Sequence, residues 1–133
     1  MQIITLNLNG VRAATRKGLF QWLSTQQADI VCVQELKAQI PDLIDEIHSP
    51  DGFHGYFHCA EKKGYSGVGI YSRQKPATII EGLGIAEIDQ EGRYIRADYG
   101  NLSVISLYLP SGSSGEHRQN SKEFFLEKFY LPK

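Results

Sequence analysis

The chain opens with a strand pattern, a helix pattern and a second strand pattern, and this order limits the fold more than any other feature. Residues 2–8 alternate apolar and polar side chains, as a half-buried strand does. Residues 17–27 carry an apolar stripe at helical spacing. Residues 29–34 form a short apolar run, typical of a buried strand. A strand, a helix and a strand in succession predict an α/β domain.

The rest of the sequence predicts more strands than helices. Residues 41–47 fit a short helix with a proline in its first turn. A loop at 111–115 precedes a third expected helix at 116–130. The sequence ends after this helix, where an α/β domain would ordinarily continue with a strand. Gly100-Asn101 predicts a hairpin turn between two of the strands. Four further strands are expected, at residues 55–60, 68–72, 94–98 and 102–109.

Length, composition and charge exclude several classes of protein. The 133 residues suffice for one domain, and no apolar run approaches the ~20 residues of a membrane-spanning helix. The first residues lack the basic start and cleavage site of a signal peptide, so we expect a cytoplasmic protein with no membrane partner. The net charge of −1 argues against a nucleic-acid binder that relies on charge alone. A local basic rim and a bound metal would still allow phosphate binding.

Three polar residues, Asn7, Glu35 and Tyr108, stand at or near the ends of expected strands, where sites in α/β sheets gather. A carboxylate after an apolar run must be hydrated, paired or bound to a metal. Such hard oxygen ligands suit Mg²⁺, which takes one or two carboxylates and keeps waters. Structural alternatives stay open, since Glu35 would equally be solvated, Asn7 would cap the following turn and Tyr108 would pack in the core.

Several basic side chains lie in the loops near these strand ends. Each alone is typical of a solvated surface, but together they form the kind of rim that follows a phosphate backbone. These cations are Arg12, Arg16, Lys17, Lys37, Lys62 and Lys63. Asn9, which precedes Gly10, either joins Asn7 at the site or supports the turn.

Five segments occur in an order and spacing that together form a specific signal. They are Leu-Asn-Leu-Asn-Gly-Val-Arg at 6–12, Val-Gln-Glu-Leu-Lys at 33–37, Glu-Lys-Lys-Gly-Tyr-Ser-Gly-Val-Gly-Ile-Tyr-Ser at 61–72, Glu-Gly-Arg at 91–93 and Leu-Tyr-Leu-Pro at 107–110. The chain thereby resembles the exodeoxyribonuclease III and abasic-site endonuclease family of the endonuclease/exonuclease/phosphatase superfamily. Leu6 replaces a common aromatic residue and Leu36 a common threonine, but neither change removes a ligand.

The resemblance implies a fold and a reaction. Residues 1–133 would be the amino-terminal half of a domain whose fold is a four-layer α/β/β/α sandwich of the deoxyribonuclease-like type. The implied activity is Mg²⁺-dependent hydrolysis of DNA phosphodiesters in base excision repair, by 3′–5′ exonuclease and abasic-site endonuclease action, with Mn²⁺ as the alternative ion. The implied partner is double-stranded DNA with abasic sites or 3′ ends.

The resemblance also implies roles for individual residues. Glu35 matches the metal-binding glutamate, Asn7 the asparagine that supports the metal, and Tyr108 the tyrosine that contacts the scissile phosphate. We therefore expect these three to be catalytic, with Glu35 and Asn7 as metal ligands. Five more residues are implied to face DNA or to brace the site, namely Asn9, Arg12, Lys37, Tyr65 and Arg93.

Two segments of the family's second half, Gly-Asp-x-Asn and Ser-Asp-His, are missing from the 133 residues. They carry acid and base groups, and a positioned base is typically worth ~10²–10⁴-fold in rate, so we expect the isolated chain to be inactive. Half a sandwich should leave a sheet edge uncovered. A second copy of the chain or a complementing chain would cover it. The alternatives are a fragment of a longer nuclease, a non-catalytic DNA-binding or interaction module and, more remotely, a hydrolase of other phosphate esters.

Overall fold

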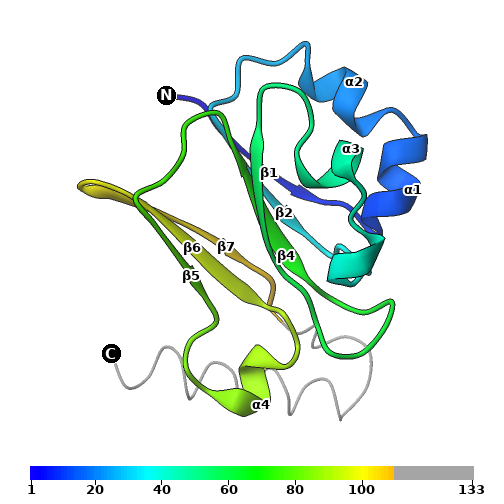
Figure 1. Ribbon diagram of the computed structural model, residues 1–133, viewed down its shortest axis with the longest axis vertical. Coiled ribbons are helices and arrows are strands. Elements are labelled where there is room, and N and C mark those ends of the chain that lie inside the picture. The colour runs from blue at the N-terminus through cyan, green and yellow to red at the C-terminus, as the bar shows by residue number, and fades with distance from the viewer. Residues whose placement is uncertain (110–133) are drawn as a thin grey trace.

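The computed structural model describes residues 1–109, and its centre is a pair of β-sheets packed face to face (Figure 1). The first sheet has the strand order β1-β2-β4-β3, and the second has the order β5-β6-β7. The strands are β1 (Ile3–Asn7), β2 (Ile30–Gln34), β3 (His54–His58), β4 (Val68–Ser72), β5 (Thr78–Glu81), β6 (Tyr94–Tyr99) and β7 (Leu102–Leu107). The helix expected at 116–130 and the loop expected at 111–115 lie outside the described residues.

Short helices cover the outer face of the first sheet (Figure 1). Val11 and Leu23, from two of these helices, pack with Val31 and Val33 of β2 in one buried cluster. The helical elements are α1 (Val11–Arg16), α2 (Leu19–Leu23), the 3-10 turn η1 (Ile40–Asp42), α3 (Asp45–His48) and α4 (Ala86–Asp89). Within residues 1–109, no helix is long and apolar enough to cross a membrane. The layer order of helices, sheet and sheet agrees with the α/β/β part of the expected sandwich.

The strand register brings several polar strand ends to one edge of the first sheet. β1 and β2 run parallel, with Asn7 opposite Gln34. β4 runs antiparallel to β2, so its first residue, Val68, also lies opposite Gln34. The end of β1, the end of β2 and the start of β4 therefore meet at the same edge.

The second sheet contains the hairpin that the sequence predicts. β6 and β7 are antiparallel and pair from Tyr94–Leu107 to Tyr99–Leu102, which leaves Gly100-Asn101 as the turn. Gly100 adopts a φ of 69°, a conformation that glycine reaches without steric cost. On the inner face, Ile95 and Val104 join Cys32 and Ile70 of the first sheet in a shared buried cluster. Contact between these apolar faces holds the two sheets together.

Several element boundaries differ from the sequence prediction. The helix predicted at 17–27 is shorter in the structure, where only α2 (Leu19–Leu23) is helical. The helix α1 before it was not predicted, and Gly18, in the left-handed region with a φ of 95°, separates the two. The helix predicted at 41–47 is split into η1 and α3. The sequence analysis missed β5 and α4, which have four residues each and are too short to show a clear apolar period.

One face of β1 is open among the described residues. β7, the last strand of the second sheet, contacts β2 rather than β1. On β1, Ile4 and Leu6 pack against the helical side, whereas the side chains of Ile3, Thr5 and Asn7 are exposed. Ile3 is 47% exposed although it is apolar and lies within a strand.

Candidate active site

Glu35 follows β2 at the edge where the polar strand ends meet. Its main chain adopts a φ of 53°, and its carbonyl oxygen accepts a hydrogen bond of 2.8 Å from the amide of Gly10. The side chain is half-buried. Asn7 lies one residue away in register, because it pairs with Gln34. The parallel pairing of β1 and β2 thus brings the ends of both strands together, as expected from the sequence.

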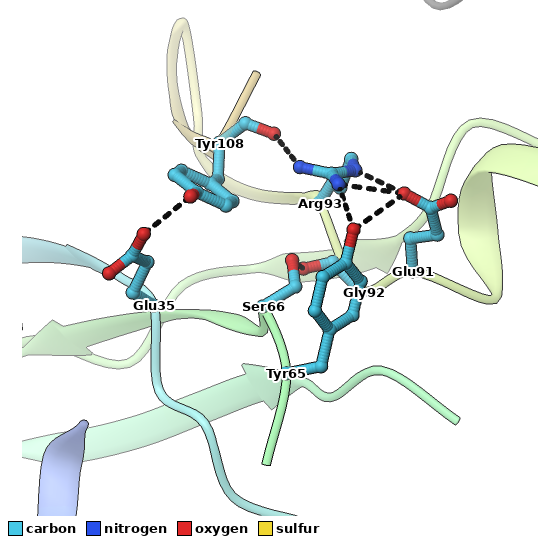
Figure 2. A network of polar contacts seen from close by, with 7 residues as sticks. All are labelled: Glu35, Tyr65, Ser66, Glu91, Gly92, Arg93 and Tyr108. Atoms are coloured by element: carbon cyan, nitrogen blue, oxygen red, sulfur yellow. Dashed lines mark hydrogen bonds and ion pairs between the residues drawn. The ribbon is translucent and has the colours of Figure 1, made fainter. Parts of the chain in front are cut away.

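Tyr108 reaches Glu35 from the other sheet. It follows β7, and its hydroxyl donates a short hydrogen bond to the Oε1 atom of Glu35 (Figure 2). Both side chains are partly shielded from water, and hydrogen bonds to a charged carboxylate are stronger than neutral ones. The contact joins residues that are 73 positions apart in sequence. The sequence predicted that Glu35 and Tyr108 would share a site, and the fold brings these two side chains into contact.

Asn7 caps the turn that follows β1, which is the structural role that the sequence analysis left open for it. Its Oδ1 atom accepts a hydrogen bond of 3.0 Å from the amide of Asn9, which caps the turn after β1. The Oδ1 atom of Asn9 in turn accepts a hydrogen bond of 2.6 Å from the Nζ atom of Lys37. Because the carboxamide oxygen of Asn7 has a second lone pair, capping the turn does not prevent it from binding a cation.

Arg12 and Lys37 form a second bridge between the first two loops. The Nη2 atom of Arg12 donates to the carbonyl of Lys37 at 3.1 Å. Its Nη1 atom lies 3.8 Å from Asp42, a long and solvated ion pair that contributes little to stability. Arg12 therefore holds the loop after Glu35 through one main-chain hydrogen bond, and its side chain remains 50% exposed.

Arg93 lies at the centre of a group that we call the Arg93 network, which consists of Tyr65, Glu91, Arg93 and Tyr108 (Figure 2). Its Nε and Nη2 atoms each lie 2.7 Å from Oε1 of Glu91. Nη2 also donates to the hydroxyl of Tyr65 at 2.7 Å, and Nη1 donates to the carbonyl of Tyr108 at 3.2 Å. Arg93 is only 3% exposed, so this cation is buried, whereas its counter-ion Glu91 remains 29% exposed.

Main-chain hydrogen bonds join the loops around the site. The amides of Leu36 and Lys37 donate to the carbonyls of Gly67 and Ser66, at 3.1 and 2.8 Å. The amide of Gly67 in turn donates to the carbonyl of Gly92 at 3.1 Å. The loop after β2 is thereby connected, through residues 65–67, to the loop that carries Arg93.

Strained main-chain conformations gather at the same place. In residues 1–109, the non-glycine residues with positive φ are Asn9, Glu35, Lys37 and Ser66. Such conformations cost of order 1–3 kcal/mol each and persist only where neighbouring contacts enforce them. The hydrogen bonds between the loops supply that enforcement. Strain of this kind clusters at functional sites, which supports the choice of this edge as the candidate site.

The donor set fits a hard cation that keeps part of its water shell. Within the described residues, no three His, Cys, Asp or Glu side chains come together as a metal site. Glu35 offers a carboxylate, and Asn7 offers a carboxamide oxygen. Mg²⁺ binds through one or two carboxylates plus water and substrate oxygens, whereas structural zinc requires four protein ligands.

The two cysteines are unsuited to metal binding at neutral pH. Burial raises the pKa of Cys32 to about 11. Burial, followed by the charges of Glu81 and Asp42, raises the pKa of Cys59 to about 11. Since the thiolate is the form that binds metals, both thiols stay protonated at neutral pH and are poor metal ligands.

Two contributors to the site were missed from the sequence. Glu91 lay within a quoted segment, but its role as the counter-ion of Arg93 was not predicted. Ser106 is 1% exposed and links the two sheets beneath Glu35. Its hydroxyl donates to the carbonyl of Val33 at 2.9 Å and accepts from Nε2 of Gln34 at 3.2 Å. A serine at an inward position of an apolar strand was the available signal.

Comparisons with known proteins agree with the fold. The model of the endonuclease/exonuclease/phosphatase family matches residues 4–131. An exodeoxyribonuclease from Bacillus subtilis (strain 168) is 40% identical over 89% of this chain and 46% of its own length. The structure of an AP endonuclease from Archaeoglobus fulgidus aligns with a TM-score of 0.84 and 31% identity, over 98% of this chain and 50% of that one.

A Neisseria 3′ phosphatase, NExo, bound to a product DNA hairpin aligns with a TM-score of 0.82 and 27% identity, over 95% of this chain and 48% of that one. The chain therefore spans about half the length of each of these three similar proteins.

Proposed function

Because the chain belongs to the endonuclease/exonuclease/phosphatase family, we propose that it supplies one half of a DNA-repair nuclease site that hydrolyses phosphodiesters. Glu35, Asn7 and Tyr108 are the proposed catalytic residues. The hydrogen bond from Tyr108 to Glu35 carries the proposal, because it joins the two sheets at the edge where the strand ends meet. The chain corresponds in this proposal to the amino-terminal half, residues 1–133, of the complete domain.

Glu35 and Asn7 would hold Mg²⁺, with Mn²⁺ as the alternative ion. When bound, a divalent cation neutralises charge that develops on the phosphate oxygens during hydrolysis. Glu35 would contribute the negative charge that attracts the cation. The hydrogen bond from the amide of Asn9 restrains the carboxamide of Asn7. The hard oxygen character of both side chains supports Mg²⁺ over softer metals.

Tyr108 would donate a hydrogen bond from its hydroxyl to a non-bridging phosphate oxygen. The hydroxyl can donate only one hydrogen bond, and in this structure it donates to Glu35. Donation to phosphate therefore requires the tyrosine to release Glu35, whose charge would then be balanced by the cation. A donor placed where negative charge develops is typically worth ~10²–10³-fold in rate.

Double-stranded DNA with abasic sites or 3′ ends is the proposed substrate, in base excision repair. The similar proteins support this through their names, since one is an exodeoxyribonuclease, one is an AP endonuclease and one is bound to a DNA hairpin. Lys62 and Lys63 are exposed in the loop before Tyr65, and Lys62 lies 5.2 Å from the ring centre of that tyrosine. Arg12 and Lys37, with Asn9, form the opposite side of the proposed DNA rim. We assign the reaction to the cytoplasm, because both cysteines are free thiols.

A complementing polypeptide would complete the site. The 133 residues contain neither of the family segments that supply the base for the attacking water. The open face of β1, with exposed Ile3 and Thr5, offers a place for further strands. A second copy of the chain would cover this face without supplying the base, whereas a chain that carries the missing segments would do both.

Cleavage of a duplex with a single abasic site tests the proposal. The 133-residue chain would be assayed with Mg²⁺ and with a chelator, alone and after addition of a polypeptide that carries the missing segments. We expect negligible cleavage by the chain alone, metal-dependent cleavage by the mixture, and none when the mixture contains Glu35→Gln. Cleavage by the Glu35→Gln mixture at the unaltered rate would refute the assignment of Glu35.

A non-catalytic DNA-binding module is the second candidate. Glu35 is the only carboxylate in the proposed catalytic set from the described residues, which favours binding without chemistry in the isolated chain. Affinity for duplex DNA would be measured across salt concentrations, since each neutralised phosphate steepens the salt dependence. Tight binding that persists in Glu35→Gln, with no cleavage in any mixture, would favour the module.

A further inference from the structure

Arg93 is a buried cation whose hydrogen bonds end on two different tyrosines. Its side chain is 4% exposed, against 29% for its counter-ion Glu91. The Nε and Nη2 atoms of the guanidinium contact Glu91. Nη2 also donates to the Tyr65 hydroxyl, and Nη1 donates to the Tyr108 carbonyl. A planar fork with several fixed acceptors is held in one orientation, because any rotation leaves buried donors unpaired.

The burial of Arg93 separates it from the DNA-facing cations. The family resemblance left two roles open for this residue, namely contact with DNA or bracing of the site. A guanidinium that reached a phosphate would have to leave its bonds to Glu91, Tyr65 and Tyr108. Lys62 and Lys63, by contrast, are exposed at the surface of the neighbouring loop. The geometry therefore favours bracing.

Tyr108 is the residue on which this brace acts. Its amide donates to the carbonyl of Arg93 at 3.0 Å, and its own carbonyl accepts from the Nη1 atom of Arg93 at 3.2 Å. The guanidinium carbon also lies 5.2 Å from the centre of the Tyr108 ring. Arg93 thus holds both main-chain polar groups of the tyrosine and one side of its ring, while the hydroxyl reaches Glu35 (Figure 2).

We propose that Arg93, clamped by Glu91, is a positioning residue that aims the hydroxyl of Tyr108 at the carboxylate of Glu35. The inference rests on the proposed function only in that Glu35 and Tyr108 are the reacting groups there. The positioning itself needs neither metal nor DNA, because every contact in it comes from the chain. Lysine cannot replace arginine in this role, since one ammonium group cannot reproduce a planar fork.

The hydrogen-bonded state of the Tyr108 hydroxyl can be followed by NMR in the 133-residue chain. Tyrosine labelled with ¹³C at the ζ position gives one signal for each of the seven tyrosines, and the signal lost in Tyr108→Phe identifies Tyr108. Glu35→Gln should move this signal, because the charged acceptor is replaced by a neutral one. Arg93→Lys should also move the Tyr108 signal. When Glu35→Gln is added to Arg93→Lys, the further change in the Tyr108 signal should be much smaller than the change that Glu35→Gln causes in the unaltered chain.

Arg96→Lys is the matched control. Arg96 pairs with a carboxylate two residues away, with 3.0 Å between its Nε atom and Oδ1 of Asp98, just as Arg93 pairs with Glu91. It lies outside the Arg93 network, so the response of Tyr108 to Glu35→Gln should be unchanged in this variant. If both lysine variants weaken that response equally, the coupling is not specific to Arg93 and the proposal fails.

Two further outcomes decide the inference. An undiminished response to Glu35→Gln in folded Arg93→Lys would show that the arginine only stabilises the fold, because independent sites act additively. If Arg93→Lys does not fold, Glu91→Gln replaces it, since loss of the counter-charge loosens the same guanidinium. An unchanged Tyr108 signal there would also overturn the proposal. These NMR measurements use neither metal nor DNA. A failure of the cleavage assay would therefore count against the proposed function but not against the positioning role of Arg93.

Discussion

The ion pair between Glu91 and Arg93 should respond unequally to the loss of its two members. Arg93 is almost fully buried, whereas Glu91 remains 29% exposed. Glu91→Ala leaves a buried guanidinium without its counter-charge, and breaking a buried pair in this way costs about 3–5 kcal/mol. Arg93→Met leaves a carboxylate that water can reach. Methionine fills most of the vacated space, and the loss is mainly three hydrogen bonds at about 0.5–1.5 kcal/mol each.

Glu91→Ala should therefore destabilise the chain more than Arg93→Met, by about 0.5–1.5 kcal/mol. Urea denaturation of the 133-residue chain gives both free energies of unfolding, provided that the slope with denaturant stays constant among variants. Glu87→Ala is the control, because Glu87 is an exposed glutamate of α4, and it should change stability by less than about 0.5 kcal/mol. A larger loss for Arg93→Met than for Glu91→Ala would refute the reasoning from burial.

Three other predictions concern the surroundings of the site. Gly92→Ala should destabilise the chain by at least about 1–3 kcal/mol, because its Cβ atom would lie 2.5 Å from the main-chain nitrogen of Ala60. Gly64→Ala, with a similar positive φ but open space around it, should cost less in the same denaturation assay. Ser106→Ala should cost about 1–3 kcal/mol by leaving buried partners unpaired. Ser103→Ala, on the exposed side of the same strand, should cost less, and equal losses would contradict the role given to burial. Burial raises the pKa of each cysteine from 9.0 to about 11, so the folded chain keeps these protons longer than the unfolded chain. Stability should then be constant below about pH 9 and fall between about pH 9 and 11, and a rise over that interval in pH-dependent melting would contradict the assignment.

The sequence was most informative where local pattern and tertiary packing agree. β2 was predicted from its apolar run because both of its faces are buried, and the hairpin of β6 and β7 was predicted from Gly100-Asn101. The helix α1 was missed because Val11 is its only buried residue, so its six residues show no apolar stripe. The left-handed conformation of Gly18 separates α1 from α2. β5 was missed because four residues are too few to establish a period.

Some residues of the candidate site could likewise be predicted from local sequence, and others only from the packing of the sheets and loops. Glu35 and Asn7 were recognised as polar residues at strand ends, and parallel pairing of β1 and β2 brings those ends together. Tyr108 joins them only through packing of the two sheets, which no local pattern reveals. The burial of Arg93 and its pairing with Glu91 depend on three loops that are distant in sequence. Family resemblance identified the segments, but only the structure distinguishes a bracing arginine from one that faces DNA.

Calorimetric titration of Mg²⁺ into the 133-residue chain tests the metal assignment of Glu35 most directly. The account predicts binding to the unaltered chain and a loss of at least about tenfold in affinity for Glu35→Gln, equivalent to ~1.4 kcal/mol. Glu46→Gln, a change at an exposed glutamate of α3, should leave the affinity unaltered. Equal affinity of the unaltered chain and Glu35→Gln would contradict the assignment of Glu35 as the residue that holds the cation.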